Sequence, residues 1–171
     1  TGKLSGSFKL GELGRLVQNA MGSIYTNYSP YKTTEDQFIT FNFRIYNKIV
    51  ELFFPEISFD ANTFIRGEIE SDVQNFRFNF KSPGIRAFEK YIEDVDIRID
   101  NQNPLFNTYI ALANIDAGIY QISDFELINT TLNDTLFFRT EFKGGPKGKD
   151  SYNLNFYHTF NADKNSVVGL K

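Results

Sequence analysis

The stretch Asn75-Phe76-Arg77-Phe78-Asn79-Phe80-Lys81 alternates polar and apolar residues without a break. Successive side chains of a β-strand point to opposite faces, so this stretch predicts a strand with one phenylalanine face and one polar face. Four further stretches alternate in the same way, and they are Gln37–Tyr46, Glu93–Asp100, Thr135–Lys143 and Ser151–Asn161. Antiparallel sheets with one wet face produce this pattern, whereas strands of buried parallel sheets read as continuous apolar runs.

Weaker strand patterns and turn residues extend this prediction along the chain. The weaker strands are Leu4–Lys9, Glu56–Phe59, Thr63–Glu70, Thr108–Asn114, Gly118–Ile122 and Phe125–Asn129. Residues typical of turns separate the predicted strands, and they are Ser82-Pro83-Gly84, Asn101-Gln102-Asn103-Pro104, Asn133-Asp134 and Gly144-Gly145-Pro146. The predicted fold class is all-β, a curled antiparallel sheet of about ten strands that forms a groove-like open half-barrel, with one or two short helices.

The two helix candidates are Gly11–Met21 and Asn47–Phe53. Apolar residues recur at helical spacing in the first, and Pro55 follows the second. We expect residues 1–171 to form a single β-rich segment, with a helix and loop entry at 1–36 and an amphipathic sheet at 37–171. The start without Met and the strand-like end at Ser166–Lys171 suggest a segment excised from a longer protein.

Composition narrows the possible functions. The chain has 19 Phe, 9 Tyr and no Trp, so many aromatic side chains must cover one another, a ligand or a partner. The formal net charge is −3 and the charges are evenly spread, which argues against a nucleic-acid partner. The absence of cysteine excludes disulfides, thiol nucleophiles and thiolate metal sites, and it fits a periplasmic protein as well as many cytosolic ones.

Residues that carry chemistry are scarce. His158 is the only histidine, and it alternates in phase with Phe156 and Phe160, which favours a ring packed among aromatics over a base or metal ligand. The acidic residues of Glu93–Asp100 alternate with Val95 and the following isoleucines, which favours a solvated strand face. The loop 144–151 lacks the spacing of a phosphate-binding loop. We therefore expect no catalytic residues, no metal site and no cofactor, and hence no enzyme.

The apolar stripe of the strands allows two interpretations. It is either the interior of an ordinary sandwich or an apolar groove that accepts an acyl chain. The one-sided strands and the apparently cut ends favour the groove. Its expected lining consists of alternating apolar residues of the strands, and these are Ile39, Phe41, Phe43, Ile65, Ile69, Phe76, Phe78, Phe80, Ile97, Leu136, Phe138, Leu154 and Phe156.

A family resemblance supports the groove. The residues that carry it are Pro55–Asp60, Thr63–Ile69, Phe76–Pro83, Asn133–Gly145, Tyr152–Phe160 and Ser166–Gly169. From Glu51 to Lys171 the chain resembles a section of the TamB/AsmA-like family, the large subunit of the translocation and assembly module, in a Bacteroidetes-like form. These bridge-like lipid-transfer proteins belong to Gram-negative cell envelopes. The resemblance implies a long curled sheet with an apolar concave face, whose parent is anchored in the inner membrane and reaches through the periplasm toward an outer-membrane barrel protein.

The leading hypothesis is therefore a periplasmic segment whose groove shields lipid acyl chains. By the resemblance, it supports phospholipid transport to the outer membrane, or protein assembly there. The expected ligand is a phospholipid or another acyl-chain molecule, and the barrel protein is contacted by other parts of the parent. The alternative is a closed sandwich or barrel that serves as a structural or carbohydrate-binding module, with Tyr25, Tyr28 and Tyr31 as exposed platforms.

Overall fold

The computed structural model describes residues 2–24, 28–116, 118, 120–161, 163 and 165–171. Its strands are β1 (Gly2–Ser7), β2 (Phe38–Arg44), β3 (Ile57–Phe59), β4 (Phe64–Glu70), β5 (Asn75–Ala87), β6 (Lys90–Asp100), β7 (Thr108–Asp116), β8 (Gln121–Leu132), β9 (Thr135–Gly144), β10 (Asp150–Phe160) and β11 (Ser166–Leu170). The helices are a short 3-10 turn (Leu10–Glu12), α1 (Leu13–Gly22) and α2 (Asn47–Phe53).

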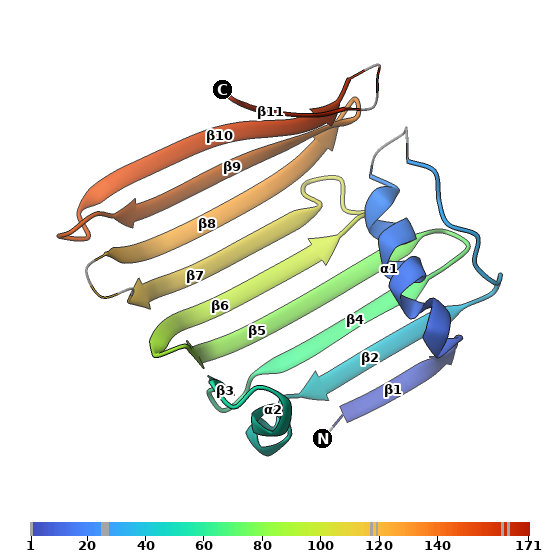
Figure 1. Cartoon of the computed structure of the whole chain (residues 1–171), viewed down its shortest axis with the longest axis horizontal. Helices are drawn as coiled ribbons and strands as arrows, with labels where there is room; N and C mark the ends of the chain where they lie inside the picture. The colour runs from blue at the N-terminus through green and yellow to red at the C-terminus, as the bar shows by residue number, and fades with distance from the viewer. Residues whose placement is uncertain (1, 25–27, 117, 119, 162, 164) are drawn as a thin grey trace.

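All eleven strands belong to one antiparallel sheet (Figure 1). The order is β1-β2-β4-β5-β6-β7-β8-β9-β10-β11, and β3 pairs with the end of β5. The sheet is open, because β1 and β11 lie at opposite ends of this order. The predicted all-β fold with an open antiparallel sheet and two short helices is confirmed. Within the described part of the chain, no helix has the length and apolar character needed to cross a membrane.

Helix α1 lies across one face of the sheet, over β4 and β5 (Figure 1). Leu13, Leu16, Val17 and Ala20 recur at helical spacing and form its apolar stripe. Leu16 and Ala20 are buried in a core cluster with residues of β2, β4 and β5. The apolar stripe therefore holds α1 on this part of the sheet, because packing there buries the stripe away from solvent.

The segment after α1 is held by one buried side chain, Asn19. Its Nδ2 donates to the carbonyl oxygen of Tyr31 over 2.8 Å, and its Oδ1 accepts from the amide of Tyr31 over 2.8 Å. The hydroxyl of Tyr28 donates to the same Oδ1 over 3.0 Å. These bonds satisfy the amide and tie the return segment to the helix.

One predicted turn is wrong. Ser82, Pro83 and Gly84 do not end a strand but lie inside β5. Ser82 pairs with Val95 and Gly84 pairs with Glu93, so Pro83 occupies a position without a ladder partner. A strand tolerates proline at such a position because no ladder hydrogen bond is lost there.

Two strands that the sequence predicted separately form one strand in the structure. The described residues of Gly118–Ile122 and Phe125–Asn129 contribute to a single strand, β8. The exceptions are Gly118 and Tyr120, which lie just before it, and Ile119, which lies outside the described residues. Between Ser123 and Glu126 the pairing with β9 shifts register, and Asp124 has a φ of 51°. This bulge interrupts the alternation of apolar residues, which is why the sequence pattern suggested two strands.

Candidate ligand-binding face

Cross-strand register places every predicted lining residue on the same side of the sheet, here named the apolar face. Directly paired residues of neighbouring strands share a face, so rows can be followed across the sheet. One row consists of Phe43, Ile65, Phe80, Ile97, Ile110, Leu127, Thr140 and Leu154. The next row consists of Phe41, Gly67, Phe78, Ile99, Thr108, Asn129, Phe138 and Phe156. The remaining predicted residues, Ile39, Ile69, Phe76 and Leu136, lie one further row along the same strands.

Helix α1 covers only part of this face. Ile39, Ile69 and Phe76 are buried against Leu16 and Ala20, and they form the core of the protein. These three predicted lining residues are therefore closed to a ligand, and Leu136 of β9 is also buried, at 6% exposed. The region over β2, β4 and β5 that packs against α1 is named the covered half.

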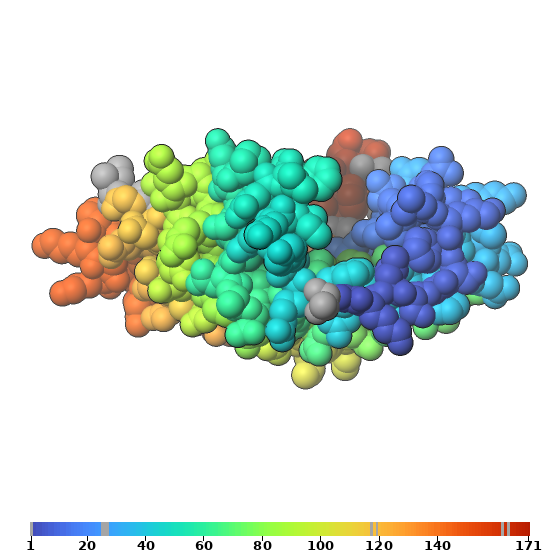
Figure 2. Space-filling model, turned by 90° about the horizontal axis from the view of Figure 1, so that it is seen from below, coloured from blue at the N-terminus to red at the C-terminus, as the bar shows by residue number. Residues whose placement is uncertain are grey.

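The apolar face over β6 to β10 is named the open half. No described helix or strand packs over it, since α1 packs on β2, β4 and β5 and α2 contacts β3. Most of its side chains are half-buried by their neighbours in the sheet, and Leu154 is 42% exposed. Figure 2 shows a shallow molecule in which the teal atoms near α2 and the blue atoms of α1 stand apart, with red atoms of the C-terminal part visible between them. The open half therefore presents apolar surface to whatever lies above it.

Aromatic pairs organise the open half. The rings of Phe138 and Phe156 stack with their centroids 4.7 Å apart, and those of Phe142 and Tyr152 stack at 4.8 Å. Phe142 also contacts Phe125 at 6.1 Å. Stacked rings restrict one another and form a continuous apolar surface across β8, β9 and β10.

Three polar side chains of the open half, those of Asn129, Thr131 and Thr140, have internal hydrogen-bond partners. The Nδ2 of Asn129 donates to the carbonyl oxygen of Phe137 over 3.2 Å, and the Oγ1 of Thr140 donates to that of Glu126 over 2.9 Å. The Oγ1 of Thr131 donates to the Oδ1 of Asn107 over 2.6 Å. No residue of the two long rows is charged. A bound apolar chain would therefore face few polar groups in need of solvent.

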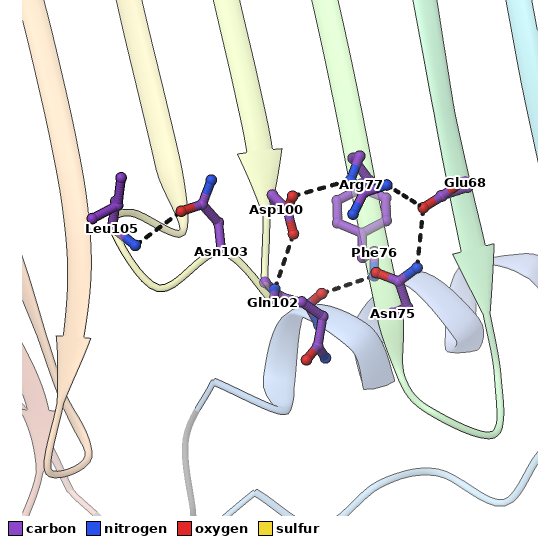
Figure 3. Close-up of polar contacts among 9 residues, drawn as sticks. Glu68, Asn75, Phe76, Arg77, Asp100, Gln102, Asn103 and Leu105 are labelled. Carbon is purple, nitrogen blue, oxygen red and sulfur yellow. Dashed lines mark hydrogen bonds and ion pairs between the residues drawn. The ribbon is translucent and has the colours of Figure 1, made fainter.

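The opposite side, here named the polar face, carries the charges. Figure 3 shows Arg77 between two carboxylates, with its Nη1 2.7 Å from Glu68 Oε1 and its Nε 3.0 Å from Asp100 Oδ2. The hydrogen bond to Asp100, together with the two negative charges, raises the pKa of Arg77. Arg98 binds Asp96 through both carboxylate oxygens, at 3.0 and 2.6 Å. Asp96 and Asp100 of the acidic cluster thus serve as ion-pair partners along the sheet.

The other candidate residues form no catalytic group among the described residues. His158 Nε2 lies 2.7 Å from Ser166 Oγ, and its ring meets Phe160 edge-on at 5.1 Å. No cluster of three or more His, Asp or Glu side chains that could hold a metal ion exists in the described ranges.

The three tyrosines of the carbohydrate-binding alternative do not form a described platform. Tyr25 lies outside the described residues. Tyr28 is half-buried with its hydroxyl on Asn19, while Tyr31 is 55% exposed.

Several residues of the apolar face were missing from the predicted lining. Ile110, Leu112 and Leu127 lie on β7 and β8 in the open half. Tyr109 and Ala111 alternate with Ile110 and Leu112, so both sides of β7 look apolar in the sequence. The sequence did indicate that Ile110 and Leu112 share one face of a strand, because they are two residues apart. The pairing of Ile110 with Ile97 was needed to show that this is the apolar face.

Comparisons with known proteins identify no relative. No protein-family model, curated protein or solved structure matches the chain.

Proposed function

We propose that the open half binds the acyl chains of lipids. The observation that carries the proposal is a pair of adjacent uncharged rows, one of which packs against the core under α1 through Phe41, Phe78 and Ile99. Both rows run across β7 to β10, where no described helix or strand packs over them. Contiguous apolar surface that stays partly accessible to solvent marks interaction sites on proteins. The occupant must be apolar and elongated, because the rows are long and uncharged.

The dimensions and energies fit an acyl chain. From β6 to β10 the rows cross four inter-strand steps, which is about 19 Å at the usual strand spacing. Full burial of a methylene group gains about 0.8 kcal/mol. A dozen methylenes half-covered on this face would gain about 5 kcal/mol, which is enough for reversible capture after ordering costs.

The cellular setting follows from the family resemblance alone and is part of the proposal. In this setting the chain is a periplasmic section of a TamB/AsmA-like protein of a Gram-negative bacterium, anchored by its parent in the inner membrane. It has no enzymatic activity. The section supports phospholipid transport to the outer membrane or protein assembly there, and other parts of the parent contact the barrel protein.

Two adjacent phenylalanines allow a matched test. Phe138 lies on the apolar face against Phe156, whereas Phe137 pairs with Tyr157 on the polar face. We expect Phe138→Asp to reduce capture of a fluorescent fatty acid by at least about tenfold, because the carboxylate would lose water under the chain. Phe137→Asp should leave capture within about twofold of the wild type.

Native mass spectrometry of the protein purified without detergent provides the second readout. We expect lipid adducts on the wild type and on Phe137→Asp, and none on Phe138→Asp. Circular dichroism of both variants establishes that each is folded. Equal loss of capture in two folded variants, or no capture by the wild type, would overturn the proposal and favour the structural-module alternative.

A further inference from the structure

One row of the polar face is rich in cations. Read by register from β1 to β6, it consists of Lys3, Asn42, Arg66, Asn79 and Arg98. The neighbouring row adds Arg44, Phe64 and Lys81 on β2, β4 and β5. Register thus gathers five cations from five strands of a chain whose formal net charge is −3.

Two adjoining hollows open among these side chains. The first has a volume of about 930 Å³, and its lining includes Lys3, Arg44 and Arg66 but no carboxylate. The second has a volume of about 640 Å³, and its lining includes Arg66, Lys81 and Arg98. Asn62, Phe64 and Arg66 line both hollows, so the two are parts of one depression. Asp96 is the only acidic residue in either lining, and Arg98 binds it.

Most of the cations that line the depression lack the carboxylate partners that neutralise arginines elsewhere on the polar face. Arg77 has two carboxylate partners (Figure 3), and Arg139 is paired with Glu141. Lys3, Arg44, Arg66 and Lys81, in contrast, form no ion pair with any described residue. The guanidinium carbon of Arg66 instead lies 5.7 Å from the centroid of the Phe64 ring. An aromatic ring beneath a guanidinium restricts its movement while its N–H donors remain available.

We propose that this depression binds a phosphate-bearing anion with at least two negative charges. Arginine offers paired donors that match phosphate oxygens, lysine adds a point charge, and the amides of Asn42 and Asn62 add neutral donors. Three cations around the first hollow match a diphosphate group better than a single carboxylate. The ligand is either a soluble phosphate compound or the phosphate headgroup of a lipid.

This site does not depend on the acyl-chain proposal. The cations of the depression lie on the polar face, and the rows that carry the acyl-chain proposal lie on the other face of the same strands. Phe80 is the one row residue in the lining of the second hollow, and the substitutions below leave it unchanged. Loss of anion binding therefore leaves fatty-acid capture unchanged, and the failure of either proposal can be recognised separately.

The experiment compares Arg66, together with Arg44 of the neighbouring row, with an arginine further along the row of Arg66. The row that contains Arg66 continues through Arg98, Tyr109 and Ile128 to Arg139, which Glu141 neutralises. Titration calorimetry at low salt uses pyrophosphate as the soluble probe and citrate as a carboxylate of similar charge. We expect Arg44→Gln/Arg66→Gln to weaken pyrophosphate binding by at least about tenfold and Arg139→Gln by less than about twofold.

A flotation assay distinguishes the two sources of phosphate. Phosphatidylcholine vesicles with and without one-fifth phosphatidic acid, whose phosphomonoester can carry two negative charges, are mixed with the wild type and with Arg44→Gln/Arg66→Gln. Binding only to the charged vesicles, lost in the variant, identifies a lipid headgroup; pyrophosphate binding alone identifies a soluble ligand. The proposal is wrong if the wild type binds neither probe, if citrate binds as tightly as pyrophosphate, or if Arg139→Gln weakens binding as much as the double substitution.

Discussion

The covered half and the open half of the apolar face are built from the same kind of residue but have different surroundings. Ile69 and Phe76 are 3% and 7% exposed beneath α1, while Leu154 in the open half is 42% exposed. One row joins Phe41 and Phe78 of the first region to Phe138 and Phe156 of the second. Alternation in a strand therefore specifies an apolar face, and a separate element decides whether that face becomes a core or remains available.

The largest expected effect is a loss of stability, and it is tested by truncating one leucine in each half. Leu16 of α1 is 2% exposed, so Leu16→Ala should cost about 3 kcal/mol of the free energy of unfolding through lost burial and a residual cavity. Leu154→Ala in the open half should cost less than about 1 kcal/mol. Urea denaturation followed by circular dichroism measures both. Similar costs for the two substitutions would mean that the open half is packed as a core.

An intermediate effect is expected at Gly67, which lies in the covered half between Phe41 and Phe78. A Cβ atom at this position would lie 2.5 Å from the carbonyl oxygen of Arg77 and 2.6 Å from the Phe41 ring. Gly67→Ala should therefore cost about 1–3 kcal/mol of the free energy of unfolding, because backbone atoms must move. Thermal unfolding of this variant beside Gly14→Ala, whose site on α1 is free of neighbours within 4 Å, provides the control.

The smallest expected effect concerns the attachment of α1 and depends on pH. Glu12 Oε2 accepts hydrogen bonds of 2.8 Å from the Thr34 amide and from Gln37 Nε2, which tie the start of α1 to the segment before β2. The Thr34 amide, followed by Gln37, lowers the pKa of Glu12 below its ordinary value of 4.5. Its contribution to stability is therefore complete above pH 4.5 and is lost as the pH falls through the lowered value.

Glu12→Gln removes this titration. We expect the wild type to be the more stable protein at pH 7 and the difference to shrink as the pH falls below 4.5. Thermal unfolding of both proteins between pH 3 and pH 7 measures it, and Glu35→Gln in the exposed part of the same segment is the control. A stability difference that does not change with pH would show that the charge of Glu12 is not involved.

Much of the fold could be predicted because the strands alternate with period two. Asn47–Phe53 was predicted with the observed bounds, and the stretch Asn75–Lys81 lies wholly within β5. Pro83 and Asp124 could not be placed correctly, since a proline or a bulge inside a long strand has the same sequence signature as a turn.

The candidate sites could be predicted only in part. Alternation assigned Phe138 and Phe156 to one side of their strands, but only the position of α1 shows that Phe76 is core and Phe138 is not. The cationic depression was missed because Lys3, Arg44 and Arg66 lie far apart in the sequence. Cross-strand register joins them, and register depends on pairing partners that a single strand does not reveal.

The order of strands in the sheet has a consequence for how the molecule holds together. From β4 to β11 each strand pairs with the next one along the chain. Such a meander resembles a linear array in which cooperativity passes from neighbour to neighbour, as in repeat proteins. Among the described residues no helix or strand packs over the hairpins far from α1, so we expect local opening to begin at the β11 margin and to proceed inward strand by strand.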